Sequence, residues 1–96
     1  MAGYRPDISP HIAEIVRHLP PEVKRDIKQA LRSLSEDPFS GTSLIRELSG
    51  LSRIKVRRFR VVYAPDRKAR LLRIFAIAHR REVYEKTAEL LRLNQK

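Results

Sequence analysis

The sequence contains no cysteine and no long hydrophobic run. Without cysteine the chain can form neither a disulfide framework nor a thiolate zinc site, which fits a reducing compartment. No run approaches the about 18 apolar residues of a membrane span, and the first ten residues lack the apolar stretch of a signal peptide. We therefore expect a cytoplasmic protein that does not bind membranes, with residues 1–96 folded as a single domain.

The common signatures of catalytic and cofactor sites are also missing. The sequence has no GxxxxGKS/T phosphate loop, no GxGxxG and no GxSxG nucleophile motif. Its three histidines, His11, His18 and His79, have no acidic residues at the spacing of a metal site. We expect His11 and His18 to be ordinary surface residues, and we expect neither a metal nor a cofactor.

Acidic residues are scarce in one stretch of the chain. Residues 51–84 hold eleven Lys or Arg against two acidic residues, whereas residues 1–50 hold seven of each. The net charge of +10 therefore lies almost wholly in residues 51–84. Charge that served only solubility would be spread over the surface. Its concentration in one segment indicates a polyanion partner, with nucleic acid favoured over an anionic membrane.

The N-terminal half shows one weak strand and two helices. Residues 4–8 form a possible edge strand, because Pro6 lacks the N–H that an interior strand needs. Ser9 before Pro10 is typical of a helix start, and apolar residues at helical spacing follow up to Leu19. Residues 21–36 predict an amphipathic helix that ends at Asp37-Pro38. Its polar face carries Lys24, Arg25, Lys28 and Arg32.

The C-terminal half predicts three strands and a helix. We expect a turn at 39–43, a helical turn or irregular connector at 44–51, strands at 53–57, 59–64 and 71–78, and a closing helix over 79–93. The order is β-α-α-β-β-β-α, which predicts an α+β fold. We expect a small, mainly antiparallel sheet of about four strands, with an N-terminal helical hairpin and a C-terminal helix packed on one side of it.

The segment RIKVRRFR, residues 53–60, carries five basic residues in eight. On a strand, Arg53, Lys55 and Arg57 would lie in a row on one face, where like charges repel and do not help folding. Arg73 and the HRR segment at 79–81 would add cations from a neighbouring strand. The charge pattern alone fits both a basic face that binds nucleic acid without chemistry and a reactive basic site. Tyr84 is likewise open between a core residue and a base-stacking residue.

Three segments together resemble the RelE/ParE superfamily of bacterial and archaeal toxins from type II toxin–antitoxin pairs. They are LPPEVKRDIKQALRSLSEDP, LSGLSRIKVRRFRVVYA and IAHRREVYE, and they cover nearly the whole chain. The resemblance implies one of two activities. RelE-type members cleave messenger RNA, typically in the ribosomal A site, whereas ParE-type members inhibit DNA gyrase and cleave no RNA.

The resemblance assigns residues to an RNA-cleaving site. Lys55, Arg60, Arg80 and Tyr84 match the basic residues and the tyrosine of RelE-type sites, which favours RNA cleavage over gyrase inhibition. Arg53 stands where some members have a lysine, and arginine is a poor general base. Phosphate-binding roles fall to Arg53, Arg57, Arg58 and Arg81. The implied partners are mRNA, the ribosome and a cognate antitoxin with an acidic, apolar segment that covers the basic face.

The chemistry of RNA cleavage suits such a set of residues. The 2′-OH can attack the neighbouring phosphorus, so no external nucleophile is needed. The site must align the attack, remove a proton, stabilise charge on the phosphate and protonate the leaving oxygen. Clustered cations can do most of this by positioning and electrostatics. The sequence leaves two rivals open, a non-nucleolytic inhibitor of the ParE kind and a plain nucleic-acid-binding module.

Overall fold

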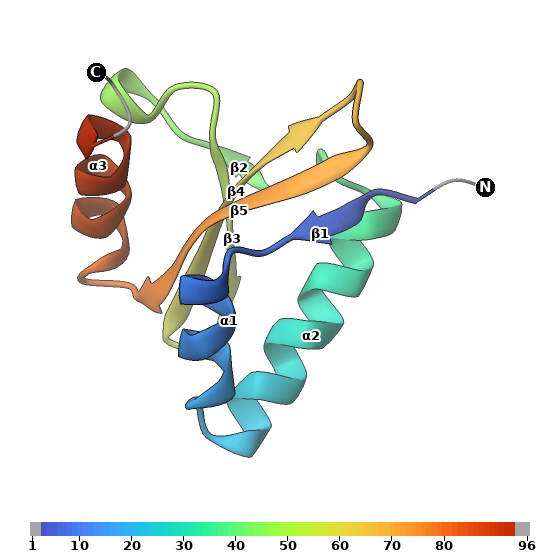
Figure 1. Cartoon of the computed structure of the whole chain (residues 1–96), viewed down its shortest axis with the longest axis vertical. Coiled ribbons are helices and arrows are strands. Elements are labelled where there is room, and N and C mark those ends of the chain that lie inside the picture. The colour runs from blue at the N-terminus through green and yellow to red at the C-terminus, as the bar shows by residue number, and fades with distance from the viewer. Residues whose placement is uncertain (1–2, 94–96) are drawn as a thin grey trace.

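The computed structural model describes residues 3–93, apart from the side chains of Leu90 and Leu93. Figure 1 shows a twisted sheet with helices on both sides. The elements in chain order are β1 (Arg5–Asp7), α1 (Pro10–Arg17), α2 (Pro21–Glu36), β2 (Thr42–Ser43), a 3₁₀ helix (Arg46–Leu48), β3 (Ser52–Val56), β4 (Phe59–Asp66), β5 (Leu71–His79) and α3 (Val83–Leu93). The predicted α+β class, the helical hairpin and the C-terminal helix are confirmed.

The sheet has five strands in the order β1-β5-β4-β3-β2. β1 pairs with β5 in parallel, and the other neighbours are antiparallel. β1 lies at an edge, as Pro6 required. The additional strand is β2, where Thr42 and Ser43 pair with β3 in a stretch that we expected to be only a turn. Two residues are too few to show the alternating pattern by which a strand is predicted.

The helices do not lie on one side of the sheet, so that prediction is wrong. One core joins α1 and α2 to the sheet through Ile12, Ile27 and Leu34, which pack with Val61 of β4. A second core joins α3 to the opposite face, where Val83 packs with apolar residues of β4 and β5. The reason is that β4 and β5 are apolar on both faces, and each face needs a cover. The nearly continuous apolar run at 71–78 already indicated this.

Register decides which side chains face which layer. Val61 and Tyr63 of β4 belong to the α1–α2 core, and Val62 between them belongs to the α3 core. Tyr63 is fully buried, and its Oη accepts a hydrogen bond of 3.1 Å from the backbone N–H of Gly41. Burial raises the pKa of Tyr63, so the phenol stays protonated and the strand end before β2 stays attached to the core.

Local signals explain the helix ends. The Oγ of Ser9 accepts a hydrogen bond of 3.2 Å from the N–H of Ile12, and Pro10 opens α1, as the sequence predicted. α2 also opens on a proline, Pro21, and ends at Glu36 before Asp37-Pro38. None of the helices within residues 3–93 has the length and hydropathy to cross a bilayer.

Candidate nucleic-acid interface and active site

Six of the residues selected from the sequence line one open pocket of about 460 Å³, which we call the basic pocket. It lies on the α3 side of the sheet, near the turn between β3 and β4. Its lining is Arg53, Lys55, Arg60, Arg80, Arg81 and Tyr84. The set includes all four proposed catalytic residues and two of the four proposed phosphate-binding residues. No carboxylate lines it, and within the described chain none of its five cations forms an ion pair with an acidic side chain.

β3 and β4 supply three of these cations through strand alternation. Arg53 and Lys55 alternate with Ile54 and Val56, which pack on the α1–α2 core, so the two basic side chains face the other side. Lys55 is paired directly with Arg60 of β4. Like charges opposite each other on an antiparallel pair are destabilising. The sheet therefore holds the two cations together at a cost to its own stability.

The guanidinium of Arg60 is oriented by the hairpin that carries it. Its Nη1 donates hydrogen bonds to the carbonyl oxygens of Phe59, at 2.9 Å, and Arg57, at 3.3 Å. Arg60 is partly buried, whereas Lys55 is exposed. Two backbone acceptors restrict the rotamers of a long side chain, so Arg60 is the most preorganised cation of the basic pocket.

The turn between β5 and α3 supplies the rest of the basic pocket. The backbone N–H of Arg80 donates a 2.9 Å hydrogen bond to the carbonyl of Arg58, which ties this turn to the β3–β4 hairpin. Tyr84 follows in the first turn of α3 and is partly buried against the α3 core. Tyr84 therefore packs on the α3 core and also lines the basic pocket, and base stacking by its ring stays a prediction.

Arg57 lies outside the basic pocket, and the prediction that it continues the row of Arg53 and Lys55 is wrong. β3 ends at Val56, and Arg57 takes a left-handed φ of 57° in the two-residue turn before Phe59. Its Nε donates to Asp26 Oδ2 of α2 at 2.6 Å. This hydrogen bond and the charge of Asp26 raise the pKa of Arg57. This ion pair could not be predicted from the sequence, because 31 residues separate Asp26 from Arg57.

His79 and Arg58 belong to a neighbouring depression, lined also by Arg80 and Arg81. The ring of His79 meets that of Phe59 edge to face, with centroids 6.1 Å apart, and Phe59 packs on the α1–α2 core. His79 thus faces the other side of the sheet from Lys55 and Arg60, and does not line the basic pocket. Arg58 lies next to the basic pocket, because Arg80 and Arg81 line both depressions.

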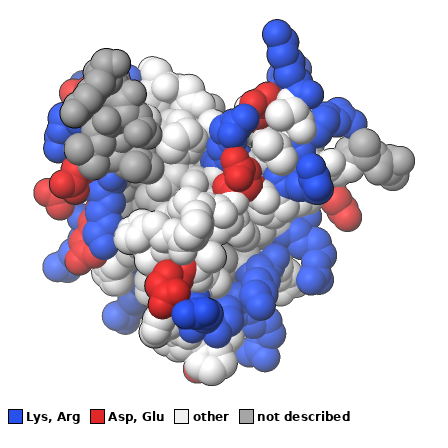
Figure 2. Space-filling view, in the orientation of Figure 1, with Lys and Arg blue, Asp and Glu red and all other residues white. Residues whose placement is uncertain are grey.

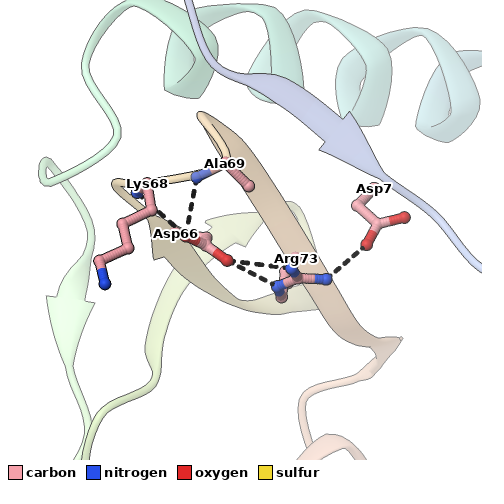
Figure 3. Close-up of polar contacts among 5 residues, drawn as sticks. All are labelled: Asp7, Asp66, Lys68, Ala69 and Arg73. Carbon is pink, nitrogen blue, oxygen red and sulfur yellow. Dashed lines mark hydrogen bonds and ion pairs between the residues drawn. The ribbon is translucent and has the colours of Figure 1, made fainter.

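Arg73, which the sequence grouped with the basic set, is neutralised by two acidic partners. Its guanidinium contacts Asp7 of β1 at 3.0 Å and Asp66 of β4 at 2.9 Å (Figure 3). Asp66 also accepts the backbone N–H groups of Ala69 and Lys68 at the β4–β5 turn. The Ala69 bond and the bond from Arg73 lower the pKa of Asp66. Arg73 therefore holds β1, β5 and β4 together.

The arrangement can bind and polarise a phosphodiester. Five cations and one phenol surround a space that is open to solvent on one side. A chain that passes through this space would meet fixed positive charge from three separate elements. Within residues 3–93 no group of three or more His, Asp or Glu side chains is placed to share a metal ion.

The α+β fold and the family match below assign the chain to a class of small toxins, the RelE/ParE superfamily. Within it, residues 4–84 match the family described as the ParE toxin of type II toxin–antitoxin systems, and the chain belongs to that family. The match spans the helical hairpin, all of the strands and the start of α3. No curated protein sequence matches the chain.

Solved structures of RelE toxins share the fold. The RelBE2 toxin–antitoxin complex from Mycobacterium tuberculosis aligns with a TM-score of 0.72 at 24% identity, over 81% of this chain and 99% of that one. A free E. coli RelE toxin, with two arginines replaced by alanine, gives 0.74 at 21% identity over 95% and 99%. The same E. coli variant bound to a RelBc antitoxin peptide gives 0.70 at 25% identity over 90% and 94%. These likenesses support the fold.

Proposed function

We propose that this toxin is an endoribonuclease that cleaves messenger RNA, in the ribosomal A site, without a metal or cofactor. The observation that carries the proposal is the basic pocket itself. Lys55, Arg60, Arg80 and Tyr84, chosen from separate parts of the sequence, line one space together with Arg53 and Arg81. A toxin that only binds a protein surface has no need to hold five unpaired cations around one hollow.

In the proposed reaction the 2′-oxygen of the substrate attacks the adjacent phosphorus and the bond from phosphorus to the 5′-oxygen breaks. The products are a 2′,3′-cyclic phosphate and a free 5′-hydroxyl. The proton of the 2′-hydroxyl must leave, and a proton must reach the departing 5′-oxygen. Since the nucleophile belongs to the substrate, the protein contributes alignment, proton transfer and charge stabilisation.

The positions of the side chains suggest how these tasks are divided. Arg60, fixed by two carbonyls, holds the scissile phosphate. Lys55, its cross-strand neighbour, assists removal of the 2′-proton or stabilises the phosphate. Arg80, in the turn opposite, stabilises or protonates the leaving oxygen. Tyr84 orients a base by stacking. Further backbone phosphates are bound by Arg53, Arg81 and Arg58, whereas Arg57 is already engaged by Asp26.

We also expect the basic pocket to be blocked by an inhibitor when the toxin is inactive. The M. tuberculosis RelBE2 structure is a toxin–antitoxin complex, and one of the E. coli RelE structures holds an antitoxin peptide. We extend this to the present chain and propose a cognate antitoxin whose acidic, apolar segment lies across the basic pocket. Acidic side chains would neutralise the five cations, and apolar ones would cover Tyr84, which is partly buried and lines the pocket.

A second candidate function is non-nucleolytic inhibition of DNA gyrase. The observation in its favour is the family match, because the matching family is described as ParE. In that case the basic pocket would bind without cleaving. The two candidates differ in what must be intact, since cleavage depends on individual side chains at the scissile phosphate, while inhibition of gyrase depends on a binding surface.

The deciding experiment is primer extension on mRNA from cells in which the chain is induced, with Arg80→Ala as the test variant. Arg92→Ala is the matched control, since Arg92 is an exposed arginine in the last turn of α3, away from the pocket. We expect new 5′ ends inside translated codons for the wild type and Arg92→Ala, and none for Arg80→Ala. Growth arrest without new RNA ends, together with loss of gyrase supercoiling in vitro, would reject cleavage and support the ParE-type candidate.

A further inference from the structure

The outer face of α2 carries a second cationic surface, separate from the basic pocket. Lys24, Lys28 and Arg32 follow one another at intervals of four residues, and Arg25 lies beside them. These four side chains line a shallow depression of about 590 Å³ with Pro21 and Gln29. We call the set Lys24, Arg25, Lys28 and Arg32 the α2 ridge. Figure 2 shows Lys and Arg gathered over α2. The large apolar side chains of the helix are buried.

The acidic residues of α2 do not neutralise this ridge. Asp26 lies about 160° around the helix from Lys28, at 100° per residue, and is held by Arg57 of the β3–β4 hairpin. Glu22 and Glu36 stand at the two ends of the helix, and Glu36, four residues beyond Arg32, forms no ion pair with it. Within the described chain no ridge residue forms an ion pair. The balanced charge of residues 1–50 therefore conceals a surface that is locally cationic.

The ridge is also remote from the basic pocket. The opposite side of α2, with Val23, Ile27, Leu31 and Leu34, packs on the sheet face that looks away from α3. The basic pocket lies on the α3 face. A ligand that lies along α2 therefore has its own contacts and leaves the pocket open.

We propose that the α2 ridge binds the sugar–phosphate backbone of double-helical RNA, in addition to the single strand taken by the basic pocket. That the ligand is RNA rests on the proposed function. That it is the backbone of a duplex rests on the spacing and the lining of the ridge. Successive ridge cations are separated by about 6 Å along the helix axis, so the ridge spans about 12 Å of a regular row of phosphates. An A-form strand sets its phosphates closer together than a B-form strand, which suits this short interval.

The lining also excludes other occupants. It contains no aromatic ring, so it offers unpaired bases nothing to stack on, unlike the basic pocket with Tyr84. It contains no large exposed hydrophobic side chain; those in the described chain are Phe39 and Ile45, neither of which is on α2. Protein partners usually bind through apolar or aromatic anchors, whereas four of the six side chains that line this depression are cationic. Regularly spaced cations without anchors favour a regularly spaced polyanion read without sequence.

The test compares two variants of equal charge. The ridge variant carries Lys24→Gln, Lys28→Gln and Arg32→Gln, which keep good helix formers in α2. The control carries Arg5→Gln, Arg46→Gln and Arg92→Gln, three exposed arginines on other elements. Binding to a blunt RNA duplex of about 14 base pairs is measured by fluorescence anisotropy across a salt series. Loss of three phosphate contacts should make the negative slope of log K against log salt shallower by about 2 to 3. It should also weaken binding by tenfold or more at moderate salt.

The outcomes separate this inference from the proposed function. We expect the ridge variant to lose duplex binding and to keep binding of a short single-stranded RNA, and Arg80→Ala to keep duplex binding and to weaken binding of the single strand. A wild type that binds the duplex through the ridge but gives no new mRNA 5′ ends in the primer-extension experiment would reject the proposed function alone. Equal losses in the ridge variant and the control would show a net-charge effect and overturn the ridge. The ridge proposal would also be overturned if the ridge bound an acidic peptide, or a DNA duplex of the same sequence, as tightly as it binds the RNA duplex.

Discussion

The contact between Gly41 and Tyr63 gives the sharpest prediction about stability. A Cβ at position 41 would overlap the Oη of Tyr63, lie 2.8 Å from the carbonyl oxygen of Arg53 and 3.0 Å from Cε1 of Tyr63. None of these atoms can move freely, because Tyr63 is fully buried and the Arg53 carbonyl belongs to β3. Gly41→Ala must therefore shift the β2–β3 edge or the tyrosine.

The expected cost follows from these contacts. Overpacking a tight site costs typically about 1–3 kcal/mol, and breaking the Gly41–Tyr63 hydrogen bond adds about 1 kcal/mol. We expect Gly41→Ala to lower the free energy of unfolding by about 2–4 kcal/mol, measured by urea denaturation. Each kcal/mol corresponds to a fall in Tm of roughly 4–8 °C for a domain of this size.

A double mutant makes the reasoning refutable. Tyr63→Phe removes only the hydroxyl, so alone it should cost about 1 kcal/mol, and combined with Gly41→Ala it should relieve part of the clash. The cost of the double mutant should therefore be less than the sum of the single costs. Gly50→Ala is the control: Gly50 has a φ of 93° and open space around it, so it tests backbone strain without a clash. An unchanged urea midpoint for Gly41→Ala, or additive costs, would contradict the proposed contact.

Three further predictions concern the candidate site and the sheet. Lys55→Arg should cleave nearly as fast as the wild type if Lys55 supplies charge, and as poorly as Lys55→Ala if it removes the 2′-proton, because arginine stays protonated near neutral pH; cleavage rates of the two variants decide, and an active Lys55→Ala rejects both roles. Arg60→Lys should lose about 10²-fold or more in cleavage rate with unchanged unfolding, since lysine has the charge but not the fork that the hairpin carbonyls orient; a wild-type rate would show that charge alone suffices. Asp66 has a pKa below its ordinary value, so its stabilisation is present in full above about pH 4 and is lost as the pH falls through the folded pKa; urea midpoints between pH 5 and 2 should converge for wild type and Asp66→Asn, and parallel curves would refute this.

Much of the local structure is determined by short-range sequence patterns. The apolar spacing of residues 21–36 and the prolines around them define α2, and Ser9-Pro10 defines the start of α1. Strand alternation in RIKV directs Arg53 and Lys55 to one face. The segment charge at 51–84 and the resemblance to RelE/ParE toxins point to the basic residues of the pocket.

The sequence did not predict which basic side chains form ion pairs with acidic residues far away along the chain. Arg73 and Arg57 carry the same charge as Arg60 and come from the same segment, yet Arg73 is paired with Asp7, 66 residues away, and Arg57 with Asp26, 31 residues away. No periodicity reports such pairs, because periodicity describes only neighbours along the chain. The side of the sheet taken by α3 is likewise a property of packing.

Which cations remain available for a ligand is therefore decided by the tertiary structure. The sequence determined that the chain is basic, where its helices and strands lie and which residue types could bind phosphate. The folded sheet determined that Lys55, Arg60, Arg80 and Tyr84 share one pocket, and that His79 faces the opposite side. Among residues 3–93 it also left the cations of α2 without an ion pair, in a segment whose net charge is zero. The physical reason is that charges are neutralised by proximity in space, and proximity between distant segments exists only after the strands have paired.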